Sequence, residues 1–270
     1  MLTGMQDSTF TQLIFDFYSQ QGRDALPWRH LSDAYKVLVS EVMLQQTQAE
    51  RVVPKYLAFL EAFPTAQSLA TARSEDVLRL WQGLGYNRRA LSLQKAAKHA
   101  VETGGFPTTV EGLQDLPGVG PYTAGAVVAF AYNKPVTMIE TNIRRVYLHH
   151  YFPEAESVSD KDLMPMIERT VDKANPREWY YALMDYGAWL AKQLPNANRR
   201  SKHYVKQSKF EGSLRQLRGK LVKLFLEEKN WEVPDLVVAT GDTPERIEKA
   251  LTSLIKEGFP VPANLASIRT

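Results

Sequence analysis

The stretch that decides the fold is Leu116-Pro117-Gly118-Val119-Gly120-Pro121-Tyr122-Thr123-Ala124-Gly125-Ala126. It joins two helical patterns through a tight turn, and the second pattern begins at about Pro121. Gly118 and Gly120 allow positive φ angles and leave the backbone N–H groups unshielded. Because these groups lie beside a helix N-terminus, such a helical hairpin can hold a DNA phosphate without reading the base sequence. Taken alone, Gly-x-Gly before a helix also describes an ordinary tight turn.

The composition favours a helical protein. The chain of 270 residues is long enough to form one large or two smaller domains with a full core. Leucine, alanine and amphipathic spacing dominate, so we expect a mainly α-helical fold. No apolar stretch approaches the roughly 20 residues that span a bilayer, and Met1–Thr11 lacks a secretory pattern. These features predict a cytoplasmic protein without a membrane partner.

The residues that bind metals most often are scarce. Cysteine is absent, which excludes disulfides, thiolate zinc sites and a cysteine-ligated iron–sulfur cluster. The spacing of the five histidines suggests no metal site, because even the adjacent pair His149-His150 would point about 100° apart on a helix. We therefore expect no metal bound by side chains and no cofactor.

Positive charge is concentrated in one segment. The net charge is only +3, but nine cations and one acid lie between Arg199 and Lys223. Such a run fits either a nucleic-acid contact or a solvated face. A boundary is expected within the polar, basic stretch from Pro195 to Gly212, which would separate a domain of residues 1–211 from a module of residues 212–270.

Helical patterns follow one another along the chain, separated by proline and glycine. Before the boundary they cover Ser8–Gln20, Ala34–Gln46, Ala49–Phe63, Ala66–Ala72, Ser74–Gln82, Arg88–Thr103, Thr109–Gln114, Tyr122–Ala131, Asn142–His150, Lys161–Val171 and Pro176–Lys192. Beyond it they cover Ser213–Lys229, Pro234–Thr240 and Thr243–Glu257. Gly258–Val261 would then start a short wing. The module is expected to be a winged helix, with a plain three-helix cap as the alternative.

Three further motifs precede the glycine turn. They are Leu26-Pro27-Trp28-Arg29, Ser40-Glu41-Val42-Met43-Leu44-Gln45-Gln46-Thr47-Gln48 and Leu80-Trp81-Gln82-Gly83-Leu84-Gly85-Tyr86. With these motifs in this order, the chain resembles the helix-hairpin-helix DNA glycosylases, and most closely the adenine DNA glycosylases of the MutY family. The resemblance extends from about Pro27 to Ala191.

The resemblance implies an all-α, two-lobed helix-hairpin-helix fold. A six-helix lobe would span about residues 30–136, and the other lobe would combine the N-terminus with residues from about 137 to 211. The implied activity is that of a base excision repair glycosylase on double-stranded DNA with a mispair or lesion. Such an enzyme extrudes the target nucleotide and then hydrolyses its N-glycosidic bond. We expect a monomer, located at the nucleoid if the source is bacterial.

The resemblance also assigns catalytic residues. Glu41 matches the acid that protonates the adenine ring and helps activate water, and its apolar neighbours would raise its pKa. A surface glutamate on an amphipathic helix is the ordinary alternative. Tyr122 occupies the position where bifunctional relatives carry the Schiff-base lysine. Without that amine, the resemblance implies a monofunctional glycosylase that lacks efficient strand cleavage.

One catalytic string departs from the family pattern. Ile139-Glu140-Thr141-Asn142 has glutamate and threonine where the family has aspartate and glycine. The carboxylate of Glu140 reaches further by one methylene, and Asn142 could orient it. Because small displacements matter in electrostatic catalysis, the change allows a slower enzyme or another substrate. We expect Glu140 to stabilise the cationic sugar, with a purely structural acid as the alternative.

Five more residues match DNA-contacting positions. Arg29 corresponds to a residue that helps bind the target base, Gln46 to one that fills the gap left by the extruded nucleotide, and Tyr86 to an aromatic wedge near the opposite base. A salt bridge, a polar helix surface and core packing would explain the same residues without DNA. Gly118 and Gly120 would donate backbone N–H groups to phosphate, at a hairpin where this fold often holds a monovalent cation.

Two parts of the relatives are missing. None of the positions that match their four cluster cysteines can hold iron: Ala191, Asn198, Ser201 and Gln207. The basic residues Arg199, Arg200 and Lys202 lie in the place of that loop, and we expect them to contact DNA, held by hydrogen bonds and packing. The last residues, from about 212, are too few and too helical for the Nudix-like domain that checks for 8-oxoguanine.

Two classes of function remain open. The leading one is a metal-free, monofunctional glycosylase that removes a mispaired adenine, opposite 8-oxoguanine or another base; a glycosylase for a different damaged or mispaired base belongs to the same class. The competing class is a catalytically weak lesion-binding protein. Retention of Glu41, Tyr122 and Asn142 favours the enzyme, because a binding protein does not need all three.

Overall fold

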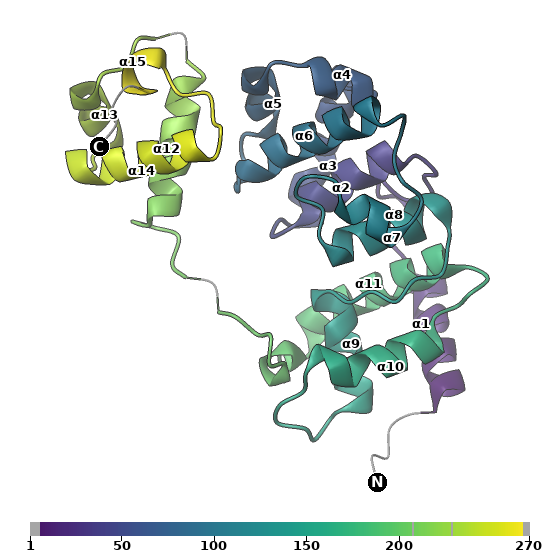
Figure 1. The fold of residues 1–270 in the computed structure, drawn as a ribbon. Coiled ribbons are helices and arrows are strands. Elements are labelled where there is room, and N and C mark those ends of the chain that lie inside the picture. The colour runs from purple at the N-terminus through teal and green to yellow at the C-terminus, as the bar shows by residue number, and fades with distance from the viewer. Residues whose placement is uncertain (1–5, 207, 228, 267–270) are drawn as a thin grey trace. The chain divides into compact units, whose positions relative to one another are not determined.

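The structure is a computed structural model that describes residues 6–206, 208–227 and 229–266, and Figure 1 traces its elements along the chain. These residues form helices α1 to α15 and one 3₁₀ helix, η1, with no β-strand among them. The all-α class is therefore confirmed. Over the same residues, no helix has the length and apolar character needed to cross a membrane.

Contacts between residues divide the chain into two compact units. Unit 1 contains the residues up to Glu41, Phe106–Asp115 and Val119–Lys206. Unit 2 contains Val42–Gly105, Leu116–Gly118 and the residues after Lys206. The boundary between residues 1–211 and 212–270 stays a prediction.

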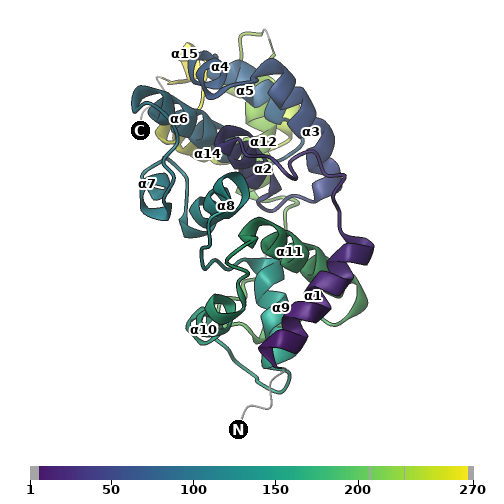
Figure 2. The same ribbon diagram turned by 90° about the vertical axis from the view of Figure 1, so that its right-hand side faces the viewer.

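Unit 1 is built around packed aromatic rings. The ring of Phe10 lies 5.1 Å from that of Tyr147 and 6.0 Å from that of Trp179, so three helices share one core. Helices α9 and α11 lie side by side in both views (Figure 1, Figure 2). The elements of the unit are α1 (Asp7–Gln21), the first part of α2 (Ala34–Leu44), α7 (Val110–Gln114), α8 (Pro121–Tyr132), α9 (Thr141–Tyr151), α10 (Asp160–Thr170), α11 (Pro176–Gln193) and η1 (Ala197–Arg200).

Unit 2 has two groups of helices. The first follows α2 and packs around Phe59 and Trp81, whose side chains are fully buried. It consists of α3 (Ala49–Ala62), α4 (Ala66–Thr71), α5 (Ser74–Trp81) and α6 (Arg88–Glu102). The second buries one face of each amphipathic helix in a small core. It consists of α12 (Leu214–Phe225), α13 (Val233–Thr240), α14 (Pro244–Lys256) and α15 (Ala263–Ala266).

The end of the chain differs from the expected wing. No strand starts at Gly258–Val261, and the short helix α15 follows within the described residues. Pro260 and Pro262 explain the difference, because a proline has no N–H group to donate to a β-ladder. The part of the module that the structure describes is a helical cap.

Candidate active site

Glu41 lies near the end of α2 and is buried, with only 5% of its surface exposed. The phenol of Tyr122 donates a hydrogen bond to its Oε2 at 2.9 Å. Burial raises the pKa of Glu41 to about 7, and the negative charge of Glu140 acts in the same direction. The Tyr122 hydrogen bond and the charge of Arg29 lower this pKa by a smaller amount. A large fraction of Glu41 is therefore protonated at neutral pH and can act as an acid.

Glu140 is also buried, but it lies at the N-terminus of α9. Its Oε1 accepts the backbone N–H groups of Asn142 at 2.6 Å and Ile143 at 2.8 Å. Burial raises the pKa of Glu140, whereas these N–H groups oppose the rise because they stabilise the carboxylate. The side chain thus caps helix α9, which is a structural function of the kind that we considered as the alternative for Glu140. The same donors also fix a negative charge in place.

Asn142 connects Glu140 to α11. Its Nδ2 lies 3.4 Å from Glu140 Oε2, and its Oδ1 accepts a 2.7 Å hydrogen bond from Arg145 Nη1. Arg145 also donates to the carbonyl of Gly187 at 2.7 Å. A Cβ atom at Gly187 would lie 2.5 Å from the Asn142 carbonyl oxygen, so only glycine allows α11 to approach this closely. The start of α9 is consequently held from several directions.

Arg29 is almost completely buried and has one donor to spare. Its Nη2 donates to Asp185 Oδ1 at 2.7 Å, and its guanidinium carbon lies 3.9 Å from the ring centroid of Tyr181. Arg23 donates to the same carboxylate from its backbone and its side chain. Nη1 of Arg29 is buried and has no hydrogen-bond partner among the described residues. Because an unpaired buried donor is costly, this atom is suited to receive a ligand acceptor.

Gln46 and Tyr86 lie in unit 2, on two loops that Arg89 holds together. Both residues have positive φ angles, 58° and 48°. Arg89 donates hydrogen bonds of 2.6–3.2 Å to backbone carbonyls before and within these loops: Val42, Met43, Leu84 and Gly85. Helix α2 ends at Leu44, two residues before the end at Gln46 that the periodic pattern predicts. The Arg89 hydrogen bonds lie at this helix end.

Tyr86 is also contacted by the C-terminal group of helices. It is 37% exposed, and its phenol oxygen lies 3.0 Å from Nη1 of Arg215 in α12. The expected alternative for Tyr86, simple core packing, does not describe a ring with this exposure. Neither Arg89 nor Arg215 was singled out as a site residue from the sequence.

The two glycines of the hairpin differ. Gly118 has a φ of 81°, and a Cβ atom there would lie 2.6 Å from Cβ of Ser92, so both backbone and packing require glycine. Gly120 is extended, with φ of −90°, and a Cβ atom there would meet nothing within 4 Å. The positive φ that we expected at both positions therefore occurs only at Gly118. Gly120 directly precedes α8, with Pro121 at its first position.

Comparison of the sequence with known proteins identifies relatives among DNA repair enzymes. Residues 39–170 match the HhH-GPD superfamily of base excision DNA repair proteins. An adenine DNA glycosylase of Mycolicibacterium smegmatis is 34% identical over 267 residues, which cover 91% of this chain and 90% of that protein. This chain belongs to the adenine DNA glycosylase family. A second member, from Buchnera aphidicola subsp. Baizongia pistaciae, is 34% identical over 201 residues, which cover 72% of this chain and 56% of the relative.

The fold is also shared with a solved glycosylase. The structure of a thermostable thymine-DNA glycosylase superposes with a TM-score of 0.59 and 27% identity, covering 67% of this chain and 86% of the other. Several adenine DNA glycosylases are longer: this chain spans about half the length of the Buchnera relative and 36% of the human one.

In this adenine DNA glycosylase family member, Ala191, Asn198 and Ser201 stand at three of the positions that were matched to cluster cysteines, and the fourth, Gln207, lies outside the described residues. With no cysteine in the sequence, this chain cannot bind a cysteine-ligated cluster. Instead, buried Asn198 donates from Nδ2 to the Thr141 carbonyl at 3.0 Å, and Ser201 pairs with Val158 in an isolated β-bridge. Among the described residues, no three histidines or carboxylates form a candidate metal site.

The three basic residues expected to contact DNA differ in this loop. Arg200 donates hydrogen bonds to the carbonyls of Leu148, at 3.0 Å, and Phe152, at 2.7 Å, and it also contacts Pro153. These contacts give Arg200 a structural function at the C-terminus of α9. Arg199 and Lys202 are exposed. A contact of this loop with DNA therefore depends first on Arg199 and Lys202, and it stays a prediction.

Proposed function

We propose that this protein is a monofunctional DNA glycosylase that hydrolyses the N-glycosidic bond of a mispaired adenine in double-stranded DNA, acting as a monomer. The supporting observation is a pair of buried glutamates with different partners: the pKa of one is raised to about 7, and the other caps a helix through backbone N–H groups. The names of its relatives point to adenine as the base. The chemistry needs both carboxyl groups, because one must donate a proton while the other remains negative.

In the proposed reaction, Glu41 transfers its proton to a ring nitrogen of the extruded adenine. The bond between the base nitrogen and C1′ of the sugar breaks, and its electron pair leaves with the protonated base. Glu140 stabilises the positive charge that develops on the sugar. A water molecule then adds to C1′, and the Glu41 carboxylate accepts its proton. Glu41 is thus restored to its starting state.

Arg29 and Tyr122 position these groups in the proposed reaction. Tyr122 binds Oε2 of Glu41, and Oε1 has no hydrogen-bond partner among the described residues, which leaves it for the base. The free Nη1 of Arg29 would donate to an acceptor atom on the adenine. Asn142 would hold Glu140 through its side-chain amide. Gln46 and Tyr86 would fill the gap in the duplex and contact the opposite strand.

The absence of strand cleavage follows from Tyr122. A lyase of this fold forms a Schiff base with a lysine amine, and a phenol cannot form one. Burial and the charges of Glu41 and Glu140 also raise the pKa of Tyr122 far above neutral pH. We infer that the product is an intact strand with an abasic site. The glycine hairpin would bind a backbone phosphate, together with a monovalent cation.

A panel of duplexes tests this function. Each duplex carries one labelled strand with adenine opposite guanine, cytosine or 8-oxoguanine, or with thymine opposite guanine, because the solved relative is a thymine-DNA glycosylase. We expect alkali-labile abasic sites only at adenine, and no cleavage before alkali. Release of thymine alone would change the substrate assignment. Tight binding to a mispair without release of any base would favour the lesion-binding protein.

A further inference from the structure

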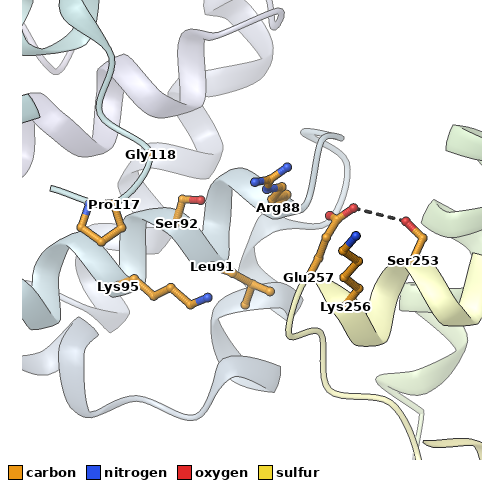
Figure 3. Close-up of a pocket in the computed structure, with 9 residues that line it drawn as sticks. All are labelled: Arg88, Leu91, Ser92, Lys95, Pro117, Gly118, Ser253, Lys256 and Glu257. Atoms are coloured by element: carbon orange, nitrogen blue, oxygen red, sulfur yellow. Dashed lines mark hydrogen bonds between the residues drawn. The ribbon is translucent and has the colours of Figure 1, made fainter. Parts of the chain in front are cut away.

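A groove of about 610 Å³ lies within unit 2, between α6 and the C-terminal end of α14 (Figure 3). None of the residues assigned to the glycosidic reaction lines it. Its walls combine the first group of helices with the C-terminal module, for which neither the family nor the proposed reaction supplies a function. The module is thereby part of a concave surface that the rest of unit 2 does not form alone.

The groove carries unpaired positive charge. Arg88 and Lys95 come from α6 and Lys256 from α14, and the two lysines approach from opposite walls in Figure 3. All three side chains are exposed, and none forms an ion pair within the described ranges. The acid that lines the groove, Glu257, is already engaged, because Arg218 donates to it at 2.6 Å. The local charge therefore attracts an anion.

The groove also adjoins the glycine hairpin. Gly118 lines it, and the close contact of Gly118 with Ser92 fixes the turn against α6. The N–H group of Gly118 has no hydrogen-bond partner among the described residues. A DNA strand whose phosphate lay at this turn would place neighbouring phosphates within a few ångströms of the groove, because successive phosphates repeat at short intervals along the backbone.

Two hydrogen bonds connect the C-terminal module to the first group of helices in unit 2. Arg215 in α12 is hydrogen-bonded to Tyr86 at 3.0 Å, next to the start of α6. Arg79 in α5 donates to the carbonyl of Leu226, just after α12, at 3.3 Å. These bonds give Lys256 a defined place opposite α6.

We propose that the groove binds a backbone phosphate of the DNA duplex beside the phosphate held by the hairpin, and that Lys256 brings the C-terminal module into contact with DNA. The proposal rests on the proposed function, because it takes double-stranded DNA as the partner. Lysine and arginine contact phosphate through charge without reading the base sequence. The module thus adds affinity and orientation, and it does so for any duplex sequence.

The salt dependence of binding tests this site. Affinity is measured for an undamaged duplex between 50 and 200 mM salt, with the full chain and the Lys256→Ala variant. Each lost phosphate contact should lower the slope of log affinity against log salt by about 0.9, which is a difference of about three- to fourfold over this range. Arg88→Ala with Lys95→Ala should lower it further. Lys249→Ala is the matched control, because Lys249 is exposed on the same helix and does not line the groove.

A second experiment locates the contact on the DNA. Single methylphosphonate linkages remove the charge of one phosphate at a time, and one linkage should weaken binding about threefold in the parent but have no effect in Lys256→Ala. Equal slopes for parent and Lys256→Ala, or equal sensitivity at every linkage, would overturn the proposal. Because the duplex contains no target base, these results are independent of glycosylase activity. A protein that binds DNA through the groove but releases no base would retain this site and lose the proposed function.

Discussion

The environments of Glu41 and Glu140 differ although the side chains are chemically identical. Glu41 is surrounded by the apolar end of α2 and receives one hydrogen bond, from a phenol. Glu140 receives two backbone N–H groups at a helix N-terminus and faces a side-chain amide as well. Burial acts on both, but two backbone N–H groups compensate the charge of Glu140, whereas a single phenol does so at Glu41. The pKa of Glu140 is still raised by burial, so the contrast lies in the donors: one phenol at Glu41 and the backbone N–H groups of a helix N-terminus at Glu140.

The difference also explains how glutamate can stand where the family has aspartate. In the proposed reaction, a carboxylate at this position would reach the substrate as well as the backbone N–H groups of α9. In this structure Oε1 makes the cap, and Oε2 has only the 3.4 Å contact with Asn142. In the proposed reaction, one oxygen of Glu140 would therefore cap α9 while the other stabilises the charge on the sugar.

Among the variants that test the two glutamates, Glu41→Gln should reduce the rate of base excision most. Glutamine can still accept the Tyr122 hydrogen bond but has no acidic proton to transfer to the base, so excision should slow by about 10³- to 10⁴-fold. Duplex binding should persist, and single-turnover excision at saturating enzyme separates the two. Glu61→Gln, an exposed glutamate, is the control. Excision by Glu41→Gln at the parental rate would remove Glu41 from the reaction.

Replacement of Glu140 by glutamine asks whether its charge matters beyond the cap. The amide oxygen can still accept both backbone N–H groups, so the cap survives while the negative charge disappears. We expect a loss of about 10²- to 10³-fold in the single-turnover rate, with a small change in stability. Glu140→Asp keeps the charge and should retain far more activity. If glutamine and aspartate variants were equally active, Glu140 would be a structural acid.

The sequence predicted the helices well and the contacts between them poorly. Apolar periodicity and the glycine and proline breaks located α1 to α11 within about two residues, and motifs identified both glutamates. It did not reveal Arg89, Arg145 or Asp185, because each of them has a partner at least 42 residues away along the chain. The expected wing at Gly258–Val261 was wrong, because Pro260 and Pro262 lack the N–H groups that a β-ladder needs. Local sequence patterns therefore predict the helices, whereas the hydrogen bonds within the site depend on side chains that are distant in the sequence.

The raised pKa of Glu41 has a consequence for stability. The unfolded carboxyl ionises near its ordinary value of 4.5, but the folded one stays protonated up to about pH 7. The free energy of unfolding therefore falls progressively as pH rises from about 4.5 to 7. The total decrease, complete above about pH 7, is roughly 3 kcal/mol. Glu41→Gln should be more stable than the parent by about this amount at pH 8, but by less than about 1 kcal/mol at pH 5. Urea unfolding at both pH values measures it, and a variant without extra stability at pH 8 would contradict the raised pKa.

The pH dependence of excision gives the smallest effect and the finest test. If protonated Glu41 is the acid, kcat/KM should fall about tenfold per pH unit above about pH 7. The Tyr122 hydrogen bond lowers the pKa of Glu41, so Tyr122→Phe should move this alkaline limb upward by up to about one pH unit. A merely structural function of Tyr122 would change the rate without moving the limb. Movement to lower pH would mean that the phenol stabilises the protonated carboxyl, and the contrast between the two glutamates would then have another cause.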